Sequence, residues 1–359
     1  MTANKTAYTP PQDSQDVEAC VDAAVERAHE WLKVTKGESS RSTEQLADMV
    51  RDPDGVSFTM DFVDRVMRPE DNKVAAQALA ELAESPEFLS KIDALMVGAG
   101  GFFGPILPNL VMPVARRRMR QMVGHLVLDA ESDALNKMLD DAAERGQDLN
   151  LNLLGEAVLG EEEAKSRFDR TMELVRNPRV TYVSVKASSL CAQLNHWDHD
   201  GSVERLKDRL RPMYREAISR KPQVFINLDM EEYHDLHLTI RLFKELLSED
   251  EFKNLEAGIV VQAYLPDAFE ALQELAEFAV ERVKNGGAPI KVRIVKGANL
   301  SLERVESEVH GWPLAPYLSK AEVDANYIRL LDYILREEYA DAIRIGVASH
   351  NLFTMGLAV

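Results

Sequence analysis

The sequence predicts an α/β protein in which an all-helical region precedes a β/α barrel. From Leu149 onward, short and almost continuously apolar runs alternate with amphipathic helical segments, a pattern typical of a parallel sheet covered by helices. Before Gly146, apolar residues recur only with helical spacing. We therefore divide the chain into a disordered tail at 1–15, a helical arm and domain at 16–147, and a barrel at 148–359.

Helical patterns follow one another through the first region. A capping box formed by Ser42 and Gln45 predicts the start of a helix that runs to Val50. Gly146 ends the last and longest helical pattern. The other helices are expected at 17–34, 58–66, 75–82 and 86–95. None of these segments has the spacing of a catalytic or metal-binding motif.

One apolar segment, Leu95–Ala115, carries no charged residue and is followed by Arg116–Arg118. This is the arrangement of a membrane-spanning helix with a positive flank. Its glycines and prolines would break such a helix, at a cost of about 3 kcal/mol for each interior proline. We therefore expect an irregular apolar arm packed on protein. A shallow contact with a membrane surface is the alternative.

Composition excludes several functional classes. The 359 residues are 45% hydrophobic and 28% charged, as in ordinary globular proteins, and the net charge of −18 argues against nucleic acid as a partner. Cys20 and Cys191 lie far apart and suit a reducing cytoplasm better than a secreted disulfide scaffold. The chain opens without the apolar core of a signal peptide. We expect a cytoplasmic protein, with peripheral contact at the inner face of the membrane as the alternative above.

The barrel region contains six expected strands, and each has a polar residue at or near its carboxyl end. The strands are expected at 149–158, 180–186, 224–229, 258–262, 291–296 and 342–349. In a β/α barrel, active sites are built at the carboxyl ends of the strands. A single polar residue there often marks only the point at which a strand leaves the apolar core. A polar residue at the end of every strand indicates that these side chains converge on one site. The residues are Glu156, Lys186, Asp229, Gln262, Arg293 with Lys296, and Ser349–His350–Asn351.

The fifth strand ends with a lysine and a glycine. Gly297 can present backbone N–H groups to an anion beside Arg293 and Lys296, so this strand end suits a phosphate. An interior ion pair at the strand end is the alternative. With Lys186, the cations of the expected site outnumber its two carboxylates, which favours an anionic cofactor or substrate.

Three functions fit this set of residues. A flavin enzyme could place a pyrophosphate at Lys296–Gly297 and Arg293 near the isoalloxazine ring. A desolvated Lys186 or Lys296 could instead form a Schiff base, as in class I aldolases. The barrel could also be a non-catalytic binding scaffold. His350 has no second histidine or cysteine at ligand spacing, so we expect no metal site.

Five motifs follow one another along the barrel region, namely Val183–Ala187, Asn227–Asp229, Val261–Ala263, Val292–Ala298 and Ala348–Asn351. Together they resemble the FAD-dependent proline dehydrogenase domain of the bifunctional proline utilization A flavoenzymes. The resemblance implies a (β/α)8 TIM-type barrel that oxidises L-proline to Δ1-pyrroline-5-carboxylate with FAD. It also implies that electrons pass to a quinone, in the first step of proline degradation to glutamate.

The resemblance also implies roles for individual residues. Lys186 and Asp229 would shape the substrate side, and Glu156 would pair with a substrate-binding arginine. The cofactor-binding set, in which Asp229 also takes part, comprises Gln262, Arg293, Lys296, Gly297, Ala298, Ser349, His350 and Asn351.

The chain departs from the family pattern in two places. Asn299–Leu300 follows Lys-Gly-Ala, where many members have tyrosine. The family's last two strands and its final helix, with an arginine pair for the proline carboxylate, do not occur before Val359. We therefore expect an incomplete barrel that is inactive alone and opens a longer polypeptide carrying an aldehyde dehydrogenase domain. A truncated non-catalytic barrel is the alternative, and homo-oligomer formation is left open.

Overall fold

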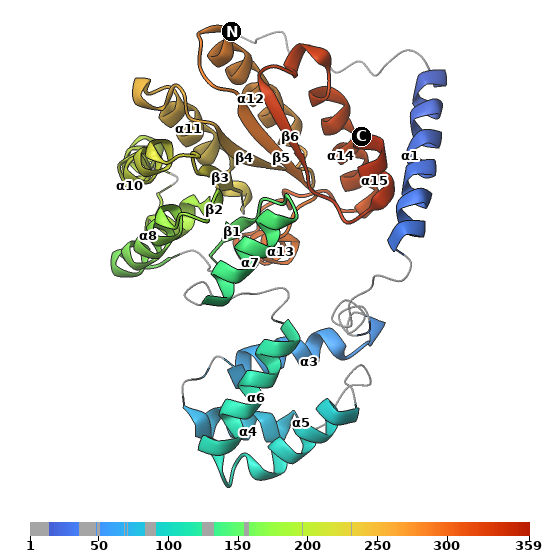
Figure 1. Cartoon of the computed structure of the whole chain (residues 1–359), viewed down its shortest axis with the longest axis vertical. Helices are drawn as coiled ribbons and strands as arrows, with labels where there is room; N and C mark the ends of the chain where they lie inside the picture. Colours follow the sequence, from blue (N-terminus) through green and yellow to red (C-terminus); the bar gives the residue numbers. More distant parts are fainter. Residues whose placement is uncertain are drawn as a thin grey trace. The chain divides into compact units, whose positions relative to one another are not determined.

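The computed structural model describes residues 14–35, 48, 51–67, 69, 71–82, 91–123, 133–153, 158–195, 197–230 and 232–359. The chain divides into two compact units, one formed by residues 1–29 with 136–359 and the other by residues 30–135 (Figure 1). The predicted tail lies outside the described residues except for Ser14 and Gln15, which begin the first helix. Most of the helix expected at 42–50 lies outside them as well. The domain boundaries of the sequence analysis stay a prediction.

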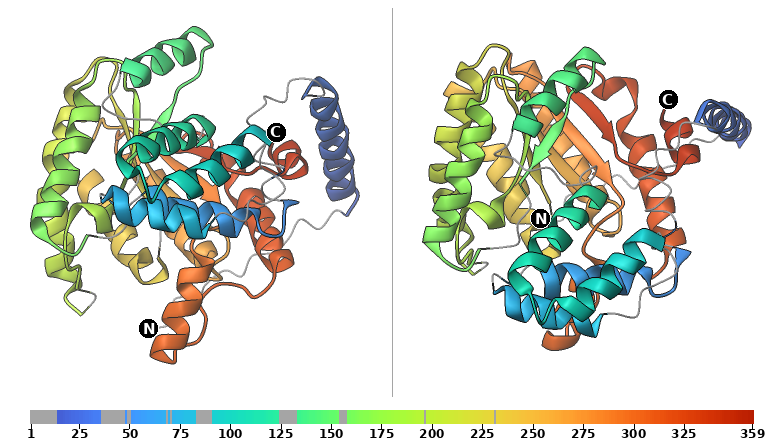
Figure 2. Two further views of the ribbon diagram at one scale, coloured as in Figure 1. Left: turned by 90° about the horizontal axis from the view of Figure 1, so that it is seen from below. Right: turned by 60° about the horizontal axis from the view of Figure 1, so that its bottom comes forward.

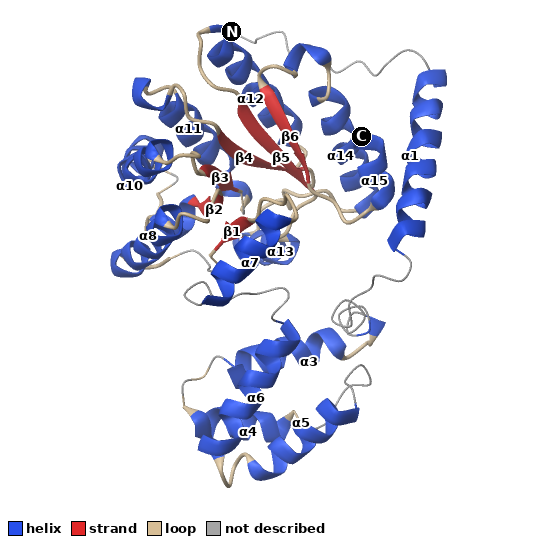
Figure 3. Ribbon diagram, in the orientation of Figure 1, coloured by secondary structure: helices blue, strands red, loops and turns tan. Residues whose placement is uncertain are grey.

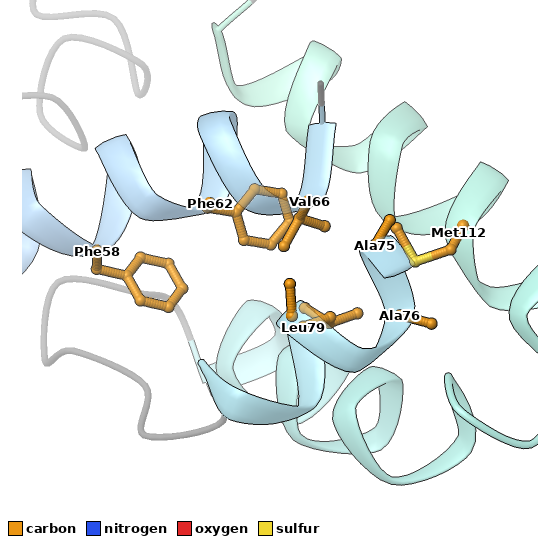
Figure 4. Close-up of a cluster of buried hydrophobic side chains, with 8 residues drawn as sticks. Phe58, Phe62, Val66, Ala75, Ala76, Leu79 and Met112 are labelled. Atoms are coloured by element: carbon orange, nitrogen blue, oxygen red, sulfur yellow. The ribbon is translucent and has the colours of Figure 1, made fainter. Parts of the chain in front are cut away.

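The second unit is helical throughout its described part. Its elements are α3 (Gly55–Phe62), the π-helix η1 (Val63–Met67), α4 (Asn72–Glu81), α5 (Lys91–Phe103) and α6 (Pro108–Val123). Their apolar faces meet in one core (Figure 4), whose residues are Phe58, Phe62, Val66, Ala75, Ala76, Ala78, Leu79 and Met112. Asp71 caps α4 by accepting a hydrogen bond from the Lys73 N–H at 2.7 Å.

Helices α5 and α6 replace the irregular arm expected at Leu95–Ala115, so that expectation was wrong. Gly100 is used for close packing, because a Cβ there would lie 3.0 Å from the Leu79 Cδ2 atom of α4. Pro108 occupies the first position of α6, where its missing N–H costs nothing. Pro113 lies inside α6. Packing against neighbouring helices thus outweighs the local helix-breaking tendency.

The basic residues after this segment also differ from expectation. The Arg116 side chain forms hydrogen bonds within the helical unit. It donates to Asn72 Oδ1 at 2.9 Å and to the Pro69 carbonyl. Arg116 is therefore engaged in holding the helical unit together. Large apolar side chains remain exposed on the α5–α6 hairpin, namely Phe102, Phe103, Ile106, Leu107, Leu110 and Val114. Within the described ranges, no helix is both long and apolar enough to cross a membrane.

The first unit contains a parallel sheet of six strands, which confirms the predicted fold class (Figure 3). The strands run in sequence order, each paired in parallel with the next. They are β1 (Asn150–Asn152), β2 (Tyr182–Lys186), β3 (Phe225–Asp229), β4 (Ala257–Gln262), β5 (Ile290–Val295) and β6 (Ile343–Val347).

Helices connect the strands and cover the outer side of the sheet. Helix α8 packs against β2, α10 against β3, α12 against β4 and α14 against β5, and two further views show the same strand–helix arrangement (Figure 2). In chain order, the helices outside α3–α6 are α1 (Ser14–Thr35), α7 (Asp133–Glu144), α8 (Glu161–Arg176), α9 (Ala187–Leu190), α10 (His199–Ser219), α11 (Leu236–Leu247), α12 (Ala268–Lys284), α13 (Leu300–His310), α14 (Lys320–Ile334) and α15 (Leu352–Ala358). Short 3₁₀ turns lie at Tyr233–Asp235, Asp250–Phe252 and Glu337–Tyr339.

Strand β5 shows how the sequence produces this arrangement. Its buried and partly buried residues alternate, because successive side chains of a strand point to opposite faces. Ile290, Val292 and Ile294 are buried on the helix-covered face. Lys291 and Arg293 lie on the other face, on the concave side of the sheet. Because all strands are parallel, their carboxyl ends share one edge, and the candidate residues gather there.

Candidate functional site

A cavity of about 770 Å³ lies at the carboxyl ends of the strands. Every predicted site residue in the described part of the chain lines it. Glu156 lies outside the described residues. The lining residues are Asn152, Lys186, Asp229, Met230, Val260, Gln262, Arg293, Val295, Lys296, Gly297, Ala298, Lys320, Ala348, Ser349, His350 and Asn351.

Asp229, at the end of β3, is the centre of a hydrogen-bond network. Its Oδ1 accepts from the Arg293 guanidinium and from the Asn227 amide, both at 2.8 Å. Its Oδ2 accepts from the Asn152 amide at 2.9 Å. Lys186 is its register partner on β2. The carboxyl group is therefore fixed by side chains from β1, β3 and β5.

Two opposing effects set the protonation of Asp229. Burial raises the pKa of this carboxyl group. The charges of Arg293 and Lys186 and hydrogen bonds from Ser184 and Asn227 lower it, but burial outweighs them and the pKa lies above its ordinary value. The Asp229 side chain is only 10% exposed, which agrees with this order. The cavity thus holds a desolvated carboxyl group directly beside a guanidinium.

Arg293 reaches Asp229 by crossing β4. Its register partner on β4 is Val260, which also lines the cavity. Arg293 Nε is buried and has no hydrogen-bond partner among the described residues. A buried donor without a partner is rare in proteins, so a ligand in the cavity could satisfy it.

Two lysines share one carboxylate at the other side of the cavity. Lys296, after β5, and Lys320, the first residue of α14, both form ion pairs with Asp324. Hydrogen bonds from these lysines lower the pKa of Asp324, so the carboxylate is charged at neutral pH. Lys320 and Asp324 were not predicted from the sequence, because they lie in a helix rather than at a strand end. The capping box of Ser319 with Glu322 was the available sequence signal, because it marks the start of α14 and so places Lys320 at the first position of that helix.

The backbone conformation and the surroundings of position 297 require glycine. Its φ angle is +132°, and a Cβ at this position would lie 2.4 Å from Cγ of Tyr264. The backbone is held there because the Tyr264 N–H donates to the Lys296 carbonyl at 2.8 Å. Glycine therefore lets the chain turn over an aromatic ring as it leaves β5 and enters the cavity wall.

The loop after β6 is fixed from both ends. The Tyr327 hydroxyl donates to the carbonyls of Ile294 and Ala348, at 3.2 and 3.1 Å. Asn351 caps α15, since its Oδ1 accepts from two N–H groups of that helix. Ser349 Oγ in turn accepts from the Asn351 N–H at 3.0 Å. His350 lines the cavity between these two hydrogen-bonded residues.

Helix α1 supports this region from far away in the sequence. Arg27 donates to the Gly356 carbonyl of α15 at 2.9 Å, and Ala24 and Ala28 are buried. A Cβ at Gly356 would lie 2.7 Å from the Ala24 carbonyl oxygen, so glycine permits this close approach. Helix α15 follows directly after the His350 loop, and α1 therefore braces the element that ends the cavity wall.

Asn152 is a further residue that the sequence analysis missed. The sequence predicts Glu156 as the polar residue at the end of the first strand, whereas β1 ends at Asn152, whose side-chain amide donates a hydrogen bond to Asp229. The alternation of Asn150 and Asn152 on one face of the strand was a weak signal for this role. Asn150 donates in the same way to Ser184 Oγ at 2.9 Å.

The lining favours an anionic ligand. Lys186, Arg293, Lys296 and Lys320 contribute positive charge, and Asp229 is the negatively charged residue among them. The described ranges contain no group of His, Cys, Asp and Glu side chains that could hold a metal ion. The arrangement suits a ligand with phosphate or carboxylate groups.

Comparison with known proteins agrees with the fold. The family model of proline dehydrogenase matches residues 135–359. The structure of proline utilization A from Corynebacterium freiburgense is similar, with 65% identity, a TM-score of 0.65, and coverage of 67% of this chain and 25% of that one. Proline utilization A from Bdellovibrio bacteriovorus has 32% identity, a TM-score of 0.74, and coverage of 94% and 35%.

A more distant structure shows the fold alone. Proline utilization A from Bradyrhizobium japonicum shares 19% identity at a TM-score of 0.66 and covers 95% of this chain and 37% of that one. The chain therefore spans about a quarter to two fifths of the length of these proteins. The comparison with curated proteins finds no match. Because the family model covers the whole sheet and the cavity at its edge, the chain belongs to the proline dehydrogenase family.

Proposed function

We propose that this chain forms the site at which L-proline is oxidised to Δ1-pyrroline-5-carboxylate with FAD, with electrons passed on to a quinone. The observation that carries the proposal is the cation-lined cavity at the strand ends of a proline dehydrogenase family member. The family assignment favours this function over the Schiff-base alternative. Lys296 is also engaged in an ion pair with Asp324, whereas a Schiff-base lysine needs a free amine.

The residues of the cavity fit FAD. The cofactor has an anionic pyrophosphate, and Lys296 and Lys320 supply adjacent cations for it beside the backbone at Gly297 and Ala298. The unpartnered Nε of Arg293 is a donor suited to a polar edge of the flavin ring. Gln262, Ser349, His350 and Asn351 complete the proposed cofactor-binding set.

FAD, when bound, supplies the hydride acceptor for the reaction. The protein contributes orientation and charge. Asp229 holds Arg293 through a 2.8 Å hydrogen bond, so the guanidinium has little freedom to leave the cavity. Lys186 offers an ammonium group on the proposed substrate side, where it would attract the carboxylate of proline. The rigid network around Asp229 thus gives both ligands a fixed electrostatic frame.

The test combines spectra with turnover. Because residues 1–359 are expected to be inactive alone, spectra and turnover are measured on the full-length protein, which should show a flavin absorption band. Arg293→Ala and Lys296→Ala should lower FAD content more than they lower stability, while Lys186→Ala should act mainly on proline-dependent dye reduction. Arg344→Ala is the matched control, because Arg344 is an exposed β6 cation paired with Glu256 outside the cavity.

Two outcomes would contradict the proposal. A colourless protein that is trapped covalently by borohydride in the presence of substrate would favour the aldolase alternative. Full FAD content and unchanged activity in the Arg293 and Lys296 variants would show that the cofactor lies elsewhere. The aldehyde dehydrogenase activity implied by the resemblance stays a prediction.

We also propose that the exposed apolar side chains of the α5–α6 hairpin contact the membrane that holds the quinone. Phe102, Ile106 and Leu110 are each more than half exposed. Co-sedimentation with liposomes of the Phe102→Ser, Leu110→Ser variant should be weaker than that of the unaltered protein. Equal co-sedimentation of the two proteins would remove this proposal.

A further inference from the structure

A second cation lies on the same face of β5 as Arg293. Lys291 precedes Arg293 by two residues, so both side chains project to the concave side of the sheet. Lys291 does not line the cavity. It lies closer to the amino-terminal end of the strand than Arg293 and has no role in the proposed reaction.

Aromatic rings hold the Lys291 ammonium group. Its Nζ atom lies 4.8 Å from the ring centroid of Tyr182 and 5.6 Å from that of Phe225. These rings, from neighbouring strands, contact each other edge to face at 4.8 Å. The Lys291 ammonium forms no ion pair within the part of the chain that the structure describes. Burial and the charge of Arg293 lower the pKa of Lys291, and Asp148 opposes them.

The neighbouring strands are shaped around this arrangement. On β4, a Cβ at Gly258 would lie 2.9 Å from Cε1 of Phe225. On β6, a Cβ at Gly346 would lie 3.1 Å from Cγ of Arg293 and 3.2 Å from Cε of Lys291. Glycine on both flanking strands thus leaves room for the two cations and the rings, which argues that the stack is a specific feature.

Filling space does not account for a lysine at this position. A methionine has nearly the same length, packs well on aromatic rings and carries no charge to desolvate. A partly buried cation without a carboxylate partner lowers stability relative to such a side chain. The two cations also repel each other, and this repulsion is offset when an anion binds at Arg293.

We propose that Lys291 is a positioning residue for the anionic cofactor: its charge, held behind Arg293 by the rings of Tyr182 and Phe225, adds to the positive potential of the cavity. This inference rests on the proposed function. A unit charge about 10 Å from a bound anion, at an effective dielectric constant of about 20 to 40, changes affinity about four- to fifteenfold.

The experiment measures FAD affinity and thermal stability in parallel. FAD is removed, and the protein is titrated with FAD while flavin fluorescence is followed; the unfolding temperature is measured without FAD. We expect Lys291→Met to weaken FAD binding about four- to fifteenfold and to leave the unfolding temperature unchanged or higher. Lys291→Arg should restore binding, since arginine keeps the charge and also stacks on rings.

Arg344→Met is the control. Arg344 is the register partner of Lys291 on β6, but it is exposed and paired with Glu256 at 3.3 Å, so its loss should not change FAD affinity. The inference is overturned if Lys291→Met binds FAD as tightly as the unaltered protein, if it is clearly less stable, or if Lys291→Arg binds as weakly as Lys291→Met. If the unaltered protein takes up no FAD, the proposed function fails and this inference falls with it.

Discussion

Replacing Gly297 by alanine should destabilise the sheet-containing unit strongly. The added Cβ would lie 2.4 Å from Cγ of Tyr264 and 2.6 and 2.7 Å from its two Cδ atoms. The ring has little room to retreat, because Tyr264 is buried and its backbone is bonded to Lys296. A φ of +132° adds strain for any residue with a side chain.

The magnitude follows from these two effects. Overpacking of this kind costs about 1–3 kcal/mol, and the backbone strain costs about 1–3 kcal/mol more. We therefore expect the free energy of unfolding to fall by about 2–6 kcal/mol. For a unit of this size, each kcal/mol corresponds to about 2–4 °C in unfolding temperature.

Gly311→Ala provides a matched comparison. Gly311 also has a positive φ, +67°, but nothing lies within 4 Å of a Cβ built there. Its substitution should cost only the backbone strain, about 1–2 kcal/mol. Both variants are to be unfolded with urea in FAD-free form. Equal losses of stability in the two would refute the role assigned to the Tyr264 ring.

Three further outcomes are expected. Burial raises the pKa of Asp229 in the folded state, so its contribution to stability is fully present below pH 3.8 and is lost as pH rises through the folded pKa. In urea titrations, the unaltered protein should therefore lose stability relative to Asp229→Asn over this rise in pH. A constant difference in the free energy of unfolding between the two proteins from pH 4 to 8 would contradict this. Phe62→Ala should destabilise the helical unit by about 3–5 kcal/mol, measured as loss of helical circular dichroism on heating, with exposed Val74→Ala as the control. Asn152→Ala should remove one donor to Asp229 and raise the pKa of that carboxyl group further, as read from its ¹³C chemical shift; an unchanged value would show that the bond to Asn152 is unimportant.

The sequence alone determined the local structure of the sheet-containing unit. Near-continuous apolar runs and helical periodicity are properties of neighbouring residues, so strands such as Tyr182–Lys186 and Phe225–Asp229 could be placed to within a few residues. Since parallel strands share one edge, the position of polar residues at the strand ends was also enough to predict that Lys186, Asp229 and Arg293 line one cavity.

Only the tertiary structure decided which of these groups interact. The hydrogen bond from Arg293 to Asp229 crosses an intervening strand, and Asp324 forms ion pairs with both Lys296 and Lys320 of α14. These interactions depend on strand order and helix placement, which no local sequence pattern encodes. The glycine- and proline-rich segment became two helices for the same reason: packing against α4, through contacts such as that of Gly100 with Leu79, outweighs local propensity. Local patterns depend on residues a few positions apart, whereas these contacts join residues that only the folded chain brings together.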